Sequence, residues 1–147
     1  MLIRKPVAEV FEAFVDPAIT SRFWFTRGSG RLEPGREVTW EWAMHGVSAQ
    51  VRVKALDRNR RIHIEWPGGG GPTTVEWRFT PMAGDTTFVS ITNTGFGGGA
   101  EAAVEQAIAS TEGFTLVLAG LKALLEHDVR LNLVADRFPE GLGKHDA

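Results

Sequence analysis

The sequence predicts an α+β fold in which one antiparallel sheet occupies the middle of the chain and helices flank it on both sides. Three observations carry the prediction. Apolar residues recur at helical spacing near the N-terminus, alternate with polar residues over much of residues 38–79, and return to helical spacing after Gly95. With 147 residues, no internal repeat and no linker-like stretch, we expect residues 1–147 to form a single domain.

Two short helices are expected close to the N-terminus. Residues 7–14 place valine and phenylalanine at helical spacing directly after Pro6, whose fixed φ suits the first turn of a helix. Asp16 can then cap a second short helix that begins with Pro17. Only residues 1–3 precede these helices, so the first strand of the fold must be very short.

Five strands follow. Residues 38–44, 47–55, 62–66 and 75–79 each alternate apolar and polar side chains, the pattern of antiparallel strands with one buried face. Residues 86–94 have apolar side chains on both faces, so the register of this fifth strand is left open. Short polar or glycine-rich connections separate the strands at residues 45–46, 57–60, 68–72 and 83–85.

The rest of the chain is predicted to be helical. Residues 100–109 form a short helix, and Ser110 or Thr111 can cap a longer one. A later helical pattern ends by Pro139, and residues 139–147 are expected to be a frayed tail. The long helix is marked by a single apolar stripe, which consists of Phe114, Val117, Leu118, Leu121, Leu124 and Leu125.

Composition excludes several classes of protein. Cysteine is absent, which excludes disulfides, thiolate metal sites and cysteine nucleophiles. The net charge of −2 and an interrupted basic strand face argue against a nucleic-acid partner. No apolar run approaches the roughly 18 residues of a membrane span, and no signal peptide is apparent, so we expect a cytoplasmic protein without membrane insertion. Five Trp and nine Phe, with no Tyr, are the unusual feature.

No cofactor or metal is expected. Gly95–Ala100 spells the glycine pattern of a dinucleotide loop, but it follows a strand late in an antiparallel meander, and no parallel strand comes after. We interpret it as a flap or a linker. The four histidines show no metal-ligand spacing; His45, in a turn at the sheet edge, is best explained as a surface residue, although it could reach a cavity mouth.

The order of elements resembles the helix-grip fold of the SRPBCC (START-like) superfamily, and within it the branch related to the activator of heat-shock-protein ATPase. Three stretches carry the resemblance: Pro6–Phe25, with Asp16-Pro17 and the cluster Phe23-Trp24-Phe25; the central hairpin Gly46–Trp66; and the helix start Glu112–Glu126. Phe114 stands where the family often has Trp. The resemblance implies a curved antiparallel sheet wrapped around a long C-terminal helix, with a cavity between them.

We expect the inward faces of the sheet and helix to line this cavity. Large flat rings bury much apolar area and stack on planar ligands, although rings in such a stripe can equally fill the core. Four tryptophans on one sheet face, opposite a helix rich in Leu and Val, favour a cavity over complete filling. The candidate ligand-binding residues are Trp40, Trp42, Met44, Trp66, Trp77, Phe79, Ile91, Asn93, Phe114, Leu118 and Leu121.

Few polar groups are predicted to point inward. Asn93 does so if Val89 and Ile91 do, and its amide would then bind either a ligand or the turn at Gly95. The strand glutamates fall on the outward face, so we identify no inward carboxylate pair for acid–base catalysis.

The leading hypothesis is that the domain binds a small hydrophobic molecule, aromatic or lipid-like, between sheet and helix. The alternatives are an enzyme of cyclase or hydrolase type acting on such a molecule, and a co-chaperone-like interaction module, which only the family branch suggests. A titratable group beside the cavity would favour the enzyme, an apolar cavity with Asn93 as its anchor would favour binding, and a cavity filled by Trp would favour the interaction module. A homodimer is also left open.

Overall fold

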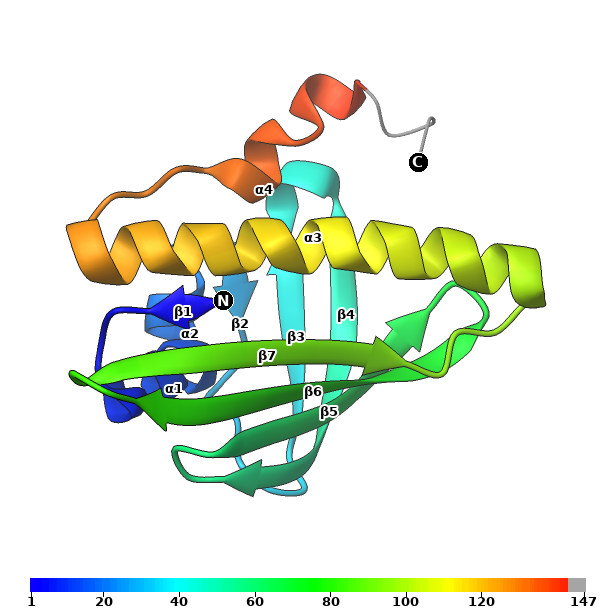
Figure 1. Ribbon diagram of the computed structural model, residues 1–147. Coiled ribbons are helices and arrows are strands. Elements are labelled where there is room, and N and C mark those ends of the chain that lie inside the picture. The colour runs from blue at the N-terminus through cyan, green and yellow to red at the C-terminus, as the bar shows by residue number, and fades with distance from the viewer. Residues whose placement is uncertain (143–147) are drawn as a thin grey trace.

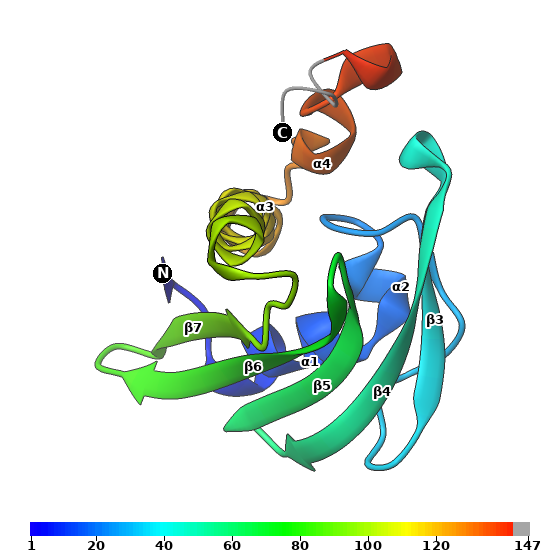
Figure 2. The same ribbon diagram turned by 90° about the vertical axis from the view of Figure 1, so that its right-hand side faces the viewer.

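The computed structural model describes residues 1–142 and confirms the predicted α+β helix-grip architecture. A seven-stranded antiparallel sheet, with strand order β1-β7-β6-β5-β4-β3-β2, curves around one long helix, α3 (Figures 1 and 2). The elements in chain order are β1 (Leu2–Ile3), α1 (Val7–Val15), α2 (Pro17–Thr20), β2 (Arg27–Gly28), β3 (Glu37–Trp42), η1 (Ala43–His45), β4 (Val47–Asp57), β5 (Arg61–Gly68), β6 (Gly71–Met82), β7 (Thr86–Thr94), α3 (Ala100–His127), α4 (Leu133–Asp136) and η2 (Pro139–Gly141).

The sheet is a meander from β3 to β7, with a two-residue strand added at each edge. The short first strand is confirmed: β1 pairs with β7, and its Leu2 lies opposite Phe88. At the other edge β2 pairs with β3 and places Gly28 opposite Trp40. No alternation in the sequence marks β2, since a strand of two residues is too short to show one.

The register of β7 is now settled. Val89 lies opposite Phe79 and is fully buried, whereas its neighbour Phe88 is 45% exposed. Successive side chains on a strand point to opposite faces, so Ile91 and Asn93 share the inward face with Val89. The condition under which Asn93 points inward is therefore met.

The N-terminal helices cover the open end of the curved sheet (Figure 2). As predicted, the Asp16 side chain caps α2 by accepting a hydrogen bond from the backbone nitrogen of Ala18, at 2.9 Å. Helix α1 contributes Phe11 and Phe14 to the core, where both rings contact Phe79 of β6. These contacts fix α1 against the inner face of the sheet.

Strand β3 is shorter than the sequence predicted. It ends at Trp42, and residues 43–45 turn into the 3₁₀ helix η1, which closes at Gly46 with a φ of 61°. Because the 3₁₀ turn rotates successive side chains, the alternation of the strand stops there. Met44 is consequently 43% exposed and does not continue the inward face, contrary to the prediction.

The predicted break within the long helix is absent. α3 runs without interruption from Ala100 to His127, and within it the hydroxyl of Thr111 donates to the carbonyl of Ala107 one turn back and does not cap a new helix. Asp128 ends α3 in the left-handed conformation, and α4 is a separate helix. Pro139 begins η2, three residues after α4 has ended. Of the predicted tail, residues 143–147 lie outside the described residues.

The expectation that no segment has the length and hydropathy of a membrane span was wrong, because helix α3 has both. Within residues 1–142 it is the one helix that meets these criteria, with a mean hydropathy of 1.4 over its most apolar window. Core helices meet them too, and α3 buries Phe114, Val117, Leu121 and Leu124 against the sheet. Length and composition alone therefore do not distinguish a membrane-spanning helix from the core helix of a folded domain.

Candidate functional site

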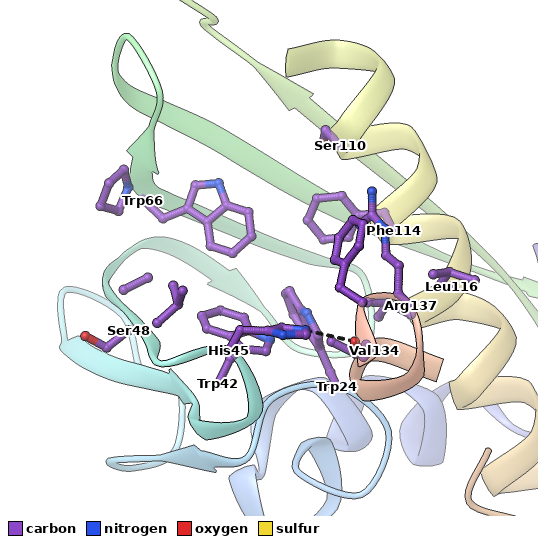
Figure 3. A pocket seen from close by; sticks show the side chains of 16 residues that line it. Trp24, Trp42, His45, Ser48, Trp66, Ser110, Phe114, Leu116, Val134 and Arg137 are labelled. Atoms are coloured by element: carbon purple, nitrogen blue, oxygen red, sulfur yellow. Dashed lines mark hydrogen bonds between the residues drawn. The ribbon is translucent and has the colours of Figure 1, made fainter. Parts of the chain in front are cut away.

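A cavity of about 500 Å³ lies between the sheet, α3 and the C-terminal segment that carries α4 (Figure 3). We call it the large cavity. The sheet contributes Trp42, Ala49 and Trp66, and α3 contributes Gly113 and Phe114. Further lining residues include Trp24, which follows α2, and Val134, Arg137 and Phe138 of the C-terminal segment.

Trp24 is the centre of the aromatic wall. Its ring centroid lies 4.9 Å from that of Trp40, 6.0 Å from those of Trp42 and Trp66, and 6.1 Å from that of Trp77, so all five tryptophans meet in one cluster. Most of these contacts are edge-to-face, a geometry worth roughly 0.5–1.5 kcal/mol for each pair beyond the burial of area. The wall is thus held in shape by its own packing.

The structure divides the predicted ligand-binding residues among four environments. Trp42, Trp66 and Phe114 line the large cavity. Ile91, Asn93, Leu118 and again Phe114 line a second cavity of about 180 Å³, which we call the small cavity. The others line neither: Trp40, Trp77, Phe79 and Leu121 are buried in the core, and Met44 is exposed. The aromatic stripe therefore both fills the core and walls a cavity.

Several lining residues were not among the predicted ones. Trp24 belongs to a loop, where strand alternation gives no orientation; only its place in an aromatic cluster marked it. Arg137 and Phe138 reach the cavity because the chain turns back after α3 and places α4 beside it (Figure 1), a tertiary contact that no local pattern reveals. His45 also lines the cavity, so it lies at the cavity mouth and not on the open surface.

His45 ties the two sides of the mouth together. Its Nε2 lies 2.9 Å from the carbonyl oxygen of Val134 in α4, and its ring stands 6.2 Å from that of Phe138 (Figure 3). A carbonyl oxygen only accepts hydrogen bonds, so Nε2 is the protonated nitrogen and donates. This bond links η1 to the C-terminal segment across the opening.

Arg137 is the one arginine or lysine among the residues that line the two cavities. Its side chain is 18% exposed; Nε donates to Oε1 of Glu112 at 3.0 Å, and the guanidinium carbon lies 4.7 Å from the centroid of the Phe138 ring. An ion pair with an exposed partner contributes little stability, typically about 0–1 kcal/mol. Its effect here is to position Arg137 at the mouth.

Asn93 connects β7 to α3 at the small cavity. Its Nδ2 donates to the hydroxyl oxygen of Ser110 at 3.0 Å, while its Oδ1 is buried and has no hydrogen-bond partner within the described residues. The structural contact of this amide is therefore with α3, whereas the sequence suggested the turn at Gly95. The unpaired oxygen leaves the ligand hypothesis for Asn93 in place.

Neither cavity is lined by a carboxylate. The glutamates with perturbed ionisation lie elsewhere. The pKa of Glu76 lies below its usual value. Partial burial acts to raise this pKa, but the hydrogen bonds and charges of Arg61 and Arg78 outweigh burial. Within residues 1–142, no group of His, Asp and Glu is arranged to hold a metal ion. The cavities thus offer hydrophobic surface and a few polar groups.

The fold and the large cavity together define a helix-grip protein built around an apolar chamber. Residues 4–126 match the family described as "Activator of Hsp90 ATPase homolog 1-like protein". The chain belongs to this family, within the superfamily that the sequence resembles. No curated protein sequence matches the chain.

Solved structures repeat the fold over most of the chain. A protein from Staphylococcus saprophyticus is 28% identical, with a TM-score of 0.75 over 89% of this chain and 91% of the other. DynU16, from the dynemicin biosynthetic locus, is 20% identical with a TM-score of 0.72; the match covers 88% of this chain but only 46% of DynU16. The Aha1 dimer from Colwellia psychrerythraea is 18% identical, with a TM-score of 0.72 over 86% and 92% of the two chains.

Proposed function

We propose that the protein binds a small hydrophobic molecule, aromatic or lipid-like, in the large cavity. The single observation that carries the proposal is the unfilled volume of about 500 Å³ walled by Trp24, Trp42, Trp66 and Phe114. Pockets for small molecules usually have volumes of about 300–1,000 Å³ and mainly apolar, aromatic linings. This cavity has both properties.

Burial of apolar surface supplies the affinity in this proposal. Transfer of apolar area from water contributes about 25 cal/mol per Å², so a fused-ring ligand that buries about 200 Å² gains roughly 5 kcal/mol. The wall is already ordered by contacts such as that between Trp24 and Trp42, so little side-chain entropy is lost when the ligand enters.

A cyclase or hydrolase acting on such a molecule is the alternative. General acid–base catalysis needs a titratable group beside the substrate. His45 is the candidate, but its Nε2 already donates to the Val134 carbonyl, and no carboxylate in the lining accompanies it. These observations favour binding over catalysis.

An interaction role stays a prediction as well. The family description refers to an activator of the Hsp90 ATPase, and one neighbour is described as a dimer. A co-chaperone-like module and a homodimer are the corresponding hypotheses for this chain. The unfilled large cavity favours ligand binding, because a pure interaction module would have no need for it.

Native mass spectrometry with a panel of aromatic and lipid molecules tests the proposal. We expect the protein to retain at least one of them, and Ala49→Phe to abolish retention, because Ala49 lines the large cavity and a phenyl group would fill it. Gln50→Phe is the matched control: it adds the same ring to the exposed face of β4 and should bind as wild type does. Absence of retention across the panel, or equal retention by Ala49→Phe, would overturn the proposal.

A further inference from the structure

The small cavity adjoins the large one. Ser110 and Phe114, one turn apart on α3, line both of them, so these two residues lie between the cavities; Figure 3 shows both at the large cavity. On its far side the small cavity is bounded by Ile91 and Asn93 of β7 and by Phe96. A second compartment therefore lies directly beside the large cavity.

Asn93 presents an unpaired acceptor at this compartment. A side-chain amide has two donor hydrogens and an oxygen that can accept two hydrogen bonds. Here Nδ2 is paired with Ser110, whereas Oδ1 is buried with no partner in the described residues. A buried polar atom without a partner is unfavourable, and the group that satisfies it is commonly a water molecule or a ligand.

The hydroxyls around Asn93 offer acceptors too. Thr111 and Thr115 line the small cavity, and each donates its hydroxyl hydrogen to a backbone carbonyl one turn back on α3, at 2.8 and 2.7 Å. Their remaining capacity is to accept. Ser110 accepts from Asn93 and keeps its own hydroxyl hydrogen as a donor. The buried Asn93 Oδ1 is the group at the small cavity without a partner in the described residues, and it favours a hydrogen-bond donor as the occupant.

We propose that the small cavity is a hydrogen-bonding subsite of the large one, in which Asn93 Oδ1 accepts from a hydroxyl or amine group of the ligand. The apolar body of that ligand lies in the large cavity, beside Trp66 and Phe114. The inference rests on the proposed function and deepens it: the preferred ligands are apolar ring systems that carry one donor group, such as phenols and aromatic amines.

Two probes that share the naphthalene ring and its 2-oxygen, one with a hydroxyl hydrogen and one with a methyl group in its place, test the subsite. Isothermal titration calorimetry compares 2-naphthol with 2-methoxynaphthalene, whose oxygen can accept but not donate. We expect wild type to bind 2-naphthol about 5- to 10-fold more tightly, the effect of one net hydrogen bond. Asn93→Leu, similar in size and without the acceptor, should bind both probes equally. Thr92→Val, on the opposite face of the same strand, is the control and should keep the preference.

The outcomes separate this inference from the proposed function. Equal binding of both probes by wild type, or tighter binding of 2-methoxynaphthalene, overturns the subsite and leaves the large cavity as the binding site. Binding of neither probe overturns both. A crystal structure of wild type with 2-naphthol needs no variant. A hydroxyl within about 3.2 Å of Asn93 Oδ1 supports the subsite, whereas water at Asn93 and a hydroxyl elsewhere overturn it.

Discussion

His45 and Val134, 89 positions apart in the chain, meet across the mouth of the large cavity through a 2.9 Å hydrogen bond. The bond joins η1, at the end of the β3–β4 hairpin, to α4, which lies beside α3 (Figure 1). It therefore fixes the C-terminal segment as the outer wall of the cavity. Ligand access, in the proposed function, depends on how firmly this segment is held.

The first prediction concerns that contact. His45→Ala removes the donor to Val134 and should release the C-terminal segment, with a loss of about 1 kcal/mol of stability. Hydrogen–deuterium exchange should show faster exchange in residues 133–138 and unchanged exchange in the core strands. The control is His127→Ala, at the exposed end of α3. Unchanged exchange at residues 133–138 in His45→Ala would show that other contacts hold the segment.

A second prediction concerns the aromatic cluster. Trp24 is buried and contacts the four other tryptophans, so Trp24→Ala should lower the free energy of unfolding by about 3–5 kcal/mol. Trp66→Ala should cost less, because Trp66 is only partly buried at the cavity wall. Urea denaturation of the two variants measures the difference. An equal or smaller loss for Trp24→Ala would contradict the central role of Trp24.

The third prediction is a dependence of stability on pH. Burial raises the pKa of Glu126, but hydrogen bonds from Lys122 and from the backbone of Arg4 outweigh burial and lower the pKa below its usual value of 4.5. A carboxyl whose pKa is lower in the folded state stabilises the fold above the unfolded pKa. That contribution is lost as the pH falls through the folded value.

Glu126→Gln tests this dependence. The variant should be less stable than wild type at neutral pH, and the difference should shrink as the pH falls below about 4.5. Thermal denaturation between pH 7 and pH 3 measures it. Glu105→Gln, at an exposed position on the same helix, is the control and should follow wild type throughout. A constant difference between Glu126→Gln and wild type would exclude the linkage.

Strand alternation and helical spacing predicted most of the fold because those patterns follow directly from which face is buried. Val75 and Trp77 alternate with polar residues, and β6 places them as expected. For β7 alternation was insufficient, since Phe88 and Val89 are both apolar; only pairing with β6 shows that Val89 faces inward. The break in α3 predicted at Ser110 or Thr111 was wrong, because residues that favour caps also occur inside helices, where packing overrides their preference.

The candidate site was less predictable than the fold, because it is made by segments far apart in the chain. Alternation along the strands assigned Trp42 and Trp66 to the inward face. It could not show which tryptophans border the cavity, because that depends on the position of Trp24, a loop residue that packs against both of them. Arg137 reaches the cavity, and Val134 reaches His45, because the C-terminal segment turns back along α3. Contacts of this kind leave no periodic signal in the sequence.

A crystal structure of the protein, determined from crystals soaked with 2-methoxynaphthalene, tests most directly whether the large cavity binds a small hydrophobic molecule. We expect electron density for the two fused rings in the large cavity, in contact with Trp42, Trp66 and Phe114. A cavity closed by movement of these aromatic rings, or density for the compound only on the outer surface, would contradict it.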